Sequence, residues 1–158
     1  MSLPTRDDFG AGFDEHFGRR LDEDSAWKEF GGKSLEEAYA HFCADPENRQ
    51  EDFMWMGERA FRFYYPVVDR YLRNVGLPED EWDCRPARIL AKDIQMHFDC
   101  HEDMSGLHES ILSLCDFVAA HLDHYSLNPN DQAEIAAAWC DLRAQVADDA
   151  RGVQRPRQ

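Results

Sequence analysis

Three side chains spaced four residues apart carry the clearest chemical signal in this sequence. Asp93, His97 and His101 lie in the stretch DIQMHFDCHED, and in a helix they would share one ridge. Carboxylates and imidazoles are ligands that zinc and other divalent metal ions prefer, and adjacent helical turns can hold one ion between them. The spacing therefore predicts a divalent metal site, with zinc as the first choice, on this helix.

The same residues also permit a structural interpretation. His97 and His101 continue an inward-facing apolar stripe, where a histidine bonded to water or to a carbonyl would serve the core instead of a metal. Cys100, Glu102 and His108 are close enough in sequence to complete a metal site, but the zinc motif HExxH and any CxxC pair are absent. Both interpretations stay open at the level of the sequence.

Other catalytic signatures are weaker. The sequence contains no GxSxG motif, and GGKS at 31–34 lacks the first glycine of a phosphate-binding loop, because Trp27 stands in its place. Cys100 beside either histidine of the ridge is conceivable as a thiol–imidazole pair. His121 and His124 stand where a helix is expected to end, a position that suits cationic side chains. These observations favour a role other than catalysis.

The charge of the chain restricts its partners. The 158 residues include 17 Lys and Arg against 32 Asp and Glu, which gives a formal net charge of −15 at pH 7. An acidic surface repels phosphate backbones and anionic lipid headgroups, so we expect neither nucleic-acid binding nor membrane binding. A basic protein is the partner that this charge favours.

Cysteine usage and hydropathy indicate a reducing compartment. The five cysteines are an odd number without close pairing, and neither a signal peptide nor a long apolar run accompanies them. A bilayer-spanning helix needs about 20 consecutive apolar residues, which no segment approaches. We therefore expect free thiols and a cytoplasmic location.

The most apolar stretch, Glu51 to Val75, predicts the central element of the fold. In a helix, its aromatic and aliphatic residues would cover nearly the whole surface, and such a helix is buried. Pro66 lies inside the stretch, and an interior proline removes one hydrogen bond and clashes with the preceding turn. We therefore expect a central helix that is kinked at Pro66 or broken into two helices there.

Further helical segments precede and follow this stretch. Ser34 and Glu37 have the spacing of a capping box, which predicts a helix from Ser34 to about Asp45. Apolar periodicity and capping residues predict the other segments. These are a partly helical arm at Arg6–Leu21 that lays its phenylalanines on the body, a turn at Ser25–Phe30 that ends at Gly31 and Gly32, and helices at about Pro86–Asp103, at about Gly106–Tyr125 and from Asn128–Pro129 onward.

Together these segments predict an all-α fold. We expect residues 1–150 to form a compact single-domain bundle of about six helices, with the aromatic-rich stretch nearest its centre. The last residues, 151–158, have no apolar period and three arginines, which predicts a flexible basic tail.

Three kinds of function are compatible with such a domain. The first is a soluble helical domain of bacterial type that binds another protein through its acidic surface, as an antitoxin-like, immunity-like or adaptor protein would. The second is a metal-binding protein or metal-dependent enzyme using the Asp93, His97 and His101 ridge. The third is a structural subunit of a homo-oligomer.

Aromatic residues are the candidates for a ligand pocket or a contact surface. Trp55, Phe63, Tyr64 and Trp82 are large enough to form an apolar interface or to line a pocket. Aromatic residues at helical spacing more often belong to the core, so this prediction competes with simple burial.

Overall fold

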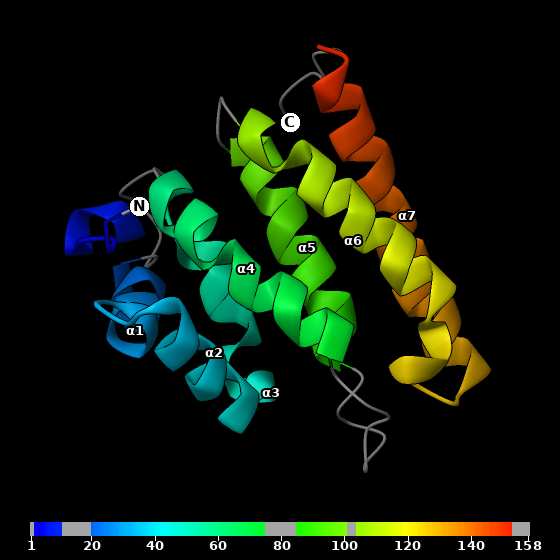
Figure 1. The fold of residues 1–158 in the computed structure, drawn as a ribbon, viewed down its shortest axis with the longest axis horizontal. Coiled ribbons are helices and arrows are strands. Elements are labelled where there is room, and N and C mark those ends of the chain that lie inside the picture. The colour runs from blue at the N-terminus through cyan, green and yellow to red at the C-terminus, as the bar shows by residue number, and fades with distance from the viewer. Residues whose placement is uncertain (1, 11–19, 75–84, 101–103, 153–158) are drawn as a thin grey trace.

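The computed structural model describes residues 2–10, 20–74, 85–100 and 104–152, and in those ranges every regular element is helical (Figure 1). The all-α prediction is confirmed. In chain order the elements are η1 (Arg6–Phe9), α1 (Arg20–Phe30), α2 (Leu35–Ala44), α3 (Pro46–Arg49), η2 (Gln50–Trp55), α4 (Glu58–Asn74), α5 (Arg85–Cys100), η3 (Ser105–Leu107), α6 (His108–Ala120), η4 (Leu122–His124) and α7 (Pro129–Ala150), where η denotes a 3-10 helix.

The helices form two halves that meet along α4, η2 and α5. Figure 1 shows η1 and α1 to α4 on one side and α5 to α7 on the other. α7 packs against both α5 and α6, while α4 packs against α2 and α6. The short helix η2 contacts both α1 and α5, so it ties the N-terminal elements to the C-terminal half.

Local capping signals set the helix ends where the sequence predicts them. Ser34 Oγ accepts a hydrogen bond from the Glu37 amide, and the Glu37 carboxylate accepts one from the Ser34 amide at 2.8 Å. Gly32, with φ of 73°, takes the left-handed conformation after α1. At the start of α7, Asn128 Oδ1 accepts a hydrogen bond from the Asn130 amide, and Pro129 occupies the first turn.

The central stretch begins differently from the prediction. Residues Gln50–Trp55 form η2, and the α-helix starts only at Glu58. From there α4 continues through Pro66 to Asn74 as one helix, so the alternative of two separate helices is wrong. Val75 lies outside the described residues.

The burial expected for the central stretch is confirmed for one of its faces. Its most buried residues are at most 2% exposed: Phe53, Met56, Ala60, Phe61, Tyr64, Tyr65, Val67, Val68 and Leu72. Tyr71 is 8% exposed, Trp55 and Phe63 are partly buried, and Arg59, Pro66 and Arg70 are exposed, so the stretch keeps one face toward solvent.

Gly57 lies between η2 and α4, and the N-terminal segment passes directly over it. The Gly57 amide donates a hydrogen bond to the Asp8 carbonyl at 3.0 Å. A Cβ atom at position 57 would lie 2.5 Å from that carbonyl oxygen and 2.7 Å from the carbonyl oxygen of Gly10. Next to this contact Phe9 is completely buried, as expected for the arm, whose residues 11–19 lie outside the described residues.

The C-terminal half follows the predicted pattern with one interruption. The segment predicted as one helix from Gly106 to Tyr125 consists of η3, α6 and η4, because α6 ends at Ala120. Most of its predicted core positions are buried all the same, as are those of α7: Ile111, Leu114, Cys115, Val118, Tyr125, Ile135, Trp139, Leu142 and Val146. Leu107 and Leu122, which belong to the same predicted pattern, are only partly buried. In the described ranges, no helix is both long enough and apolar enough to cross a membrane. Of the predicted tail, residues 153–158 lie outside the described ranges.

Candidate functional site

Helix α5 carries the predicted Asp/His ridge into the interior of the protein. Asp93 and His97 lie one turn apart and are 0% and 1% exposed. His101, the third member of the ridge, lies outside the described residues. The described part of the ridge therefore faces the junction between α5 and η2, not solvent.

His97 connects α5 to η2. Its Nε2 atom lies 2.8 Å from the Phe53 carbonyl oxygen, and its ring stacks on Phe61 with ring centres 3.7 Å apart. A carbonyl oxygen only accepts hydrogen bonds, so Nε2 carries the proton and donates. This nitrogen has no lone pair left for a metal ion in the observed geometry.

A second buried carboxyl group, Asp52 of η2, is close enough to Asp93 for its charge to act on it. Both carboxyl oxygens of Asp93 and Oδ2 of Asp52 are buried without a hydrogen-bond partner among the described residues. Burial raises the pKa of Asp93 well above its usual value, and the charges of Glu51 and Asp52 raise it further. Burial also raises the pKa of Asp52, to about 7, with a further contribution from Glu29 that Arg49 opposes. Burial thus disfavours the charged forms of both carboxyl groups.

An ion network lies beside this acidic pair and joins α1, α2 and α3. His41 Nε2 lies 2.7 Å from a Glu29 carboxylate oxygen, and Arg49 Nε lies 3.3 Å from the same oxygen. Arg49 also donates a hydrogen bond to the His41 backbone carbonyl at 2.9 Å. The hydrogen bond from His41 is the main reason that the pKa of Glu29 is lowered. Because these side chains already bond to one another, the network fixes the junction of three helices.

The described residues do not supply a complete set of ligands for the predicted metal site. Within them, no group of three or more His, Cys, Asp or Glu side chains is placed to hold a metal ion. His108, suggested as an additional ligand, instead lies 2.7 Å from an Asp149 carboxylate oxygen of α7 and stacks on Phe98. Since His101 and Glu102 lie outside the described residues, a metal site on this ridge stays a prediction.

The aromatic candidates for a pocket or contact surface lie mainly in the core. Tyr64 is 0% exposed, and its hydroxyl donates to the carbonyl oxygens of Phe30 and Lys33 at 2.6 and 2.9 Å. It is therefore not available to a partner at the surface. Trp55 and Phe63 are partly buried against the core, and Trp82 lies outside the described residues.

Exposed apolar residues are few in the described ranges. The exposed large hydrophobic side chains there are Leu3, Leu21 and Leu127, with exposed fractions of 46%, 75% and 75%. Single exposed leucines at separate places are ordinary for a protein surface. The homo-oligomer hypothesis stays a prediction, and these three leucines of the described ranges do not support it.

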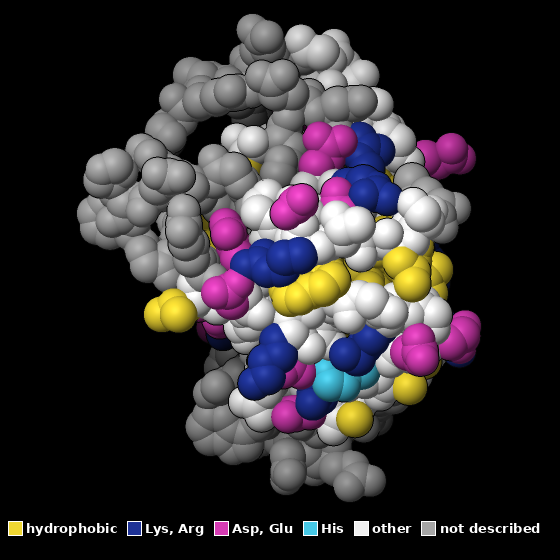
Figure 2. Space-filling view, turned by 90° about the vertical axis from the view of Figure 1, so that its left-hand side faces the viewer, with side chains coloured by type: hydrophobic (Ala, Val, Ile, Leu, Met, Phe, Trp, Pro, Cys, Tyr) yellow, Lys and Arg dark blue, Asp and Glu magenta, His cyan; other side chains and the backbone are white. Residues whose placement is uncertain are grey.

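The described arginines share one feature that the sequence does not reveal. Every arginine whose side chain the structure describes forms an ion pair with a carboxylate of the same chain. These pairs are Arg6–Asp24, Arg49–Glu29, Arg59–Asp8, Arg62–Glu58, Arg70–Glu36, Arg73–Asp69, Arg88–Glu134, Arg143–Asp116 and Arg151–Asp148. On the face formed by the N-terminal elements, basic and acidic side chains accordingly lie side by side (Figure 2).

The acidic residues outnumber these partners. Asp22, Glu109, Asp123 and Asp141 are exposed on four different elements and form no ion pair with any residue in the described ranges. The excess negative charge of the chain is therefore turned toward solvent, whereas the described guanidinium groups are paired within the protein.

Sequence reasoning missed several residues of the buried junction. Asp52 follows Glu51 and looks like part of a solvated acidic run, yet it is only 8% exposed. Glu29, His41 and Arg49 lie on three different elements, so their approach leaves no spacing signal. The one signal that the sequence offers for the burial of Asp52 is its position directly before Phe53, which is itself buried.

No family model matches the chain, and neither does any curated protein or solved structure.

Proposed function

We propose that this protein is a binding module whose acidic surface receives a basic protein partner, in the manner of an antitoxin-like, immunity-like or adaptor protein. The observation that carries the proposal is the distribution of charge. The described arginines are paired with carboxylates of the same chain, while exposed acids such as Asp22, Glu109, Asp123 and Asp141 have no such pair in the described ranges.

This distribution favours a partner with the opposite charge. Arginines held in ion pairs cannot neutralise the remaining acids without breaking their own contacts. A surface with unpaired negative charge attracts a positively charged protein over several ångströms and speeds its association. The same field disfavours nucleic acids, which are themselves anionic.

Buried hydrogen bonds between distant parts of the chain support a rigid module. Trp139 Nε1 donates to the Ala87 carbonyl at 2.7 Å, Tyr125 to the Leu72 carbonyl at 2.7 Å, and His97 to Phe53 at 2.8 Å. Each bond joins elements far apart in sequence, so the surface charges are presented on a fixed frame. A preorganised surface loses less conformational entropy when it binds.

Affinity capture followed by measurement with the purified partner tests the proposal. The tagged protein is incubated with native lysate at low salt and eluted in steps of rising salt. We expect a basic protein that is released as salt screens the contact, and an association rate that falls with ionic strength. If no basic protein is retained at low salt, the proposal is wrong.

Charge variants separate specific recognition from general attraction. One variant neutralises the four unpaired acids (Asp22→Asn, Glu109→Gln, Asp123→Asn, Asp141→Asn), and a matched variant neutralises four paired acids (Glu36→Gln, Asp116→Asn, Glu134→Gln, Asp148→Asn). Both raise the net charge equally. We expect the first variant to bind the purified partner at least about tenfold more weakly than the second. Equal affinities would contradict the idea that the unpaired acids form the contact.

A further inference from the structure

The end of α6 brings two histidines together in a tight turn. The helix stops at Ala120, the His121 amide donates to the Val118 carbonyl at 3.1 Å, and η4 turns the chain at once. His121 and His124 consequently have ring centres 5.0 Å apart with planes inclined by 49°. Both side chains are partly exposed to solvent.

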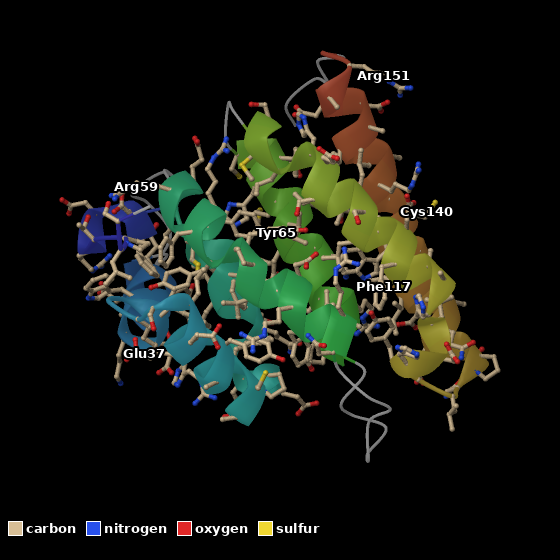
Figure 3. The ribbon with its side chains drawn as sticks, viewed as in Figure 1. Glu37, Arg59, Tyr65, Phe117, Cys140 and Arg151 are labelled. Carbon is tan, nitrogen blue, oxygen red and sulfur yellow. The ribbon has the colours of Figure 1, made fainter. Side chains whose placement is uncertain are left out.

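The surroundings of His121 fix its orientation and its tautomer. Nδ1 lies 2.7 Å from the Phe117 carbonyl oxygen, so this nitrogen carries the proton and Nε2 keeps its lone pair. The ring also stacks on Phe117, with ring centres 4.2 Å apart. Phe117, labelled on α6 in Figure 3, is itself contacted by the Arg73 guanidinium at 5.0 Å. A backbone carbonyl that orients one imidazole nitrogen is the usual support of a metal-binding histidine.

The other described histidines are engaged through Nε2. His41 and His108 bond to the carboxylates of Glu29 and Asp149, and His97 bonds to a buried carbonyl. By contrast, the imidazole of His124 forms no hydrogen bond or ion pair with any residue in the described ranges, and its ring centre lies 5.0 Å from that of His121. Asp123, exposed between the two histidines in sequence, adds negative charge nearby.

We propose that His121 and His124 form a surface chelate for a divalent ion of the nickel, copper and zinc group. Neutral imidazole is a ligand that these ions prefer over oxygen donors. His121 coordinates through Nε2 and His124 supplies the second nitrogen, while water fills the remaining positions. Two protein ligands suit a reversible site of moderate affinity, and the net charge of −15 concentrates cations at the surface.

Nickel titration of the full chain tests this site. Cys43 and Cys140 are exposed thiols that also bind such metals, so the measurement uses the Cys43→Ser and Cys140→Ser background. We expect one equivalent of Ni²⁺ by calorimetry, and paramagnetic broadening of the ring resonances of His121 and His124 in NMR spectra before those of the other histidines. Stronger broadening of other histidines would overturn the proposal.

Single substitutions show whether the two rings act together. Because a chelate gains from the effective concentration of its second ligand, His121→Ala or His124→Ala alone should weaken Ni²⁺ binding by about a hundredfold. His108→Asn, which removes an imidazole bonded to Asp149, is the control and should retain the affinity. Two independent monodentate histidines would each contribute separately, and the affinity for Ni²⁺ would then fall only twofold or less in each alanine variant. That result would show that the chelate does not exist.

Discussion

At the scale of single residues, the buried carboxyl groups of Asp52 and Asp93 are the most unusual feature of the interior. A charged carboxylate without a hydrogen-bond donor is costly inside a protein, so the protonated form is favoured there. Besides burial, the nearby charges of Glu51 and Asp52 raise the pKa of Asp93. The junction of η2 and α5 is consequently sensitive to pH.

Replacing Asp52 by asparagine should remove part of this sensitivity. The pKa of Asp52 is about 7 in the folded protein and 3.8 ordinarily, so between these values the folded state binds a proton that the unfolded state has lost. The unfolding free energy of the wild type therefore falls as pH rises from about 4 to about 7. An asparagine side chain at this position cannot titrate, so we expect Asp52→Asn to stabilise the protein by about 2 kcal/mol at neutral pH, less than the full linkage because a buried amide also needs partners.

Urea unfolding at pH 5 and at pH 7.5 measures this effect. The difference in unfolding free energy between Asp52→Asn and the wild type should be larger at the higher pH. Asp141→Asn, an exposed substitution of the same chemistry, serves as the control and should show no such trend. A variant that is less stable than the wild type at pH 7.5 would show that Asp52 is ionised and satisfied in the fold.

At the scale of elements, the join between the N-terminal segment and α4 depends on the absence of a side chain at Gly57. The carbonyl oxygens of Asp8 and Gly10 occupy the space that a Cβ atom would need. Arg59 strengthens the same join, because its guanidinium donates to the Asp8 carboxylate at 2.6 Å and to Ser2 at 2.7 Å (Figure 3).

Gly57→Ala should therefore loosen the N-terminal segment. The added methyl group meets backbone atoms that cannot rotate away, and we expect a destabilisation of about 1–3 kcal/mol. Gly10→Ala is a matched control, because a Cβ atom there meets nothing within 4 Å. Thermal unfolding and limited proteolysis of residues 1–10 report the difference. Equal stability of the two variants would mean that the segment does not pack on Gly57 as described.

Pro66 is the second feature at this scale. It lies in the interior of α4 with an exposed side chain, so it contributes little packing while it lacks the amide that would bond to the preceding turn. We expect Pro66→Ala to raise the unfolding free energy by about 1–3 kcal/mol. Pro129→Ala, in the first turn of α7, should change it little, because no partner exists there for the missing amide. Denaturant titration of both variants checks this, and a loss of stability in Pro66→Ala would contradict it.

At the scale of the whole molecule, short ion pairs coexist with a large excess of negative charge. Contacts such as Arg59–Asp8 at 2.6 Å and Arg143–Asp116 at 2.8 Å are shorter than the screening length of ordinary buffers. The repulsion among the unpaired acids acts over longer distances and is screened more strongly.

Moderate salt should consequently stabilise the folded protein. We expect the urea midpoint to rise between about 10 mM and about 200 mM sodium chloride, because screening removes more repulsion than attraction. The variant with Asp22, Glu109, Asp123 and Asp141 neutralised should show a smaller rise. A midpoint that falls with salt would mean that the ion pairs dominate the electrostatic free energy of the fold.

Local sequence signals were enough to predict the main helices and several of their ends. Capping at Ser34 and Asn128, the left-handed glycine at Gly32 and the apolar periods of α6 and α7 act over a few residues, so they can be read without knowing the rest of the fold. The burial of the central aromatic stretch follows from its composition for the same reason.

The contacts of the polar side chains, by contrast, depend on how the helices pack in space. Asp52 and Asp93 are 41 positions apart, His97 bonds to a carbonyl 44 positions away, and Arg59 reaches Asp8 across 51 positions. The space beside Gly57 is occupied by backbone of Asp8 and Gly10, which are 49 and 47 positions earlier in the chain. Charge pairing and close backbone contacts depend on distances in space, whereas periodicity and capping depend on distances along the chain.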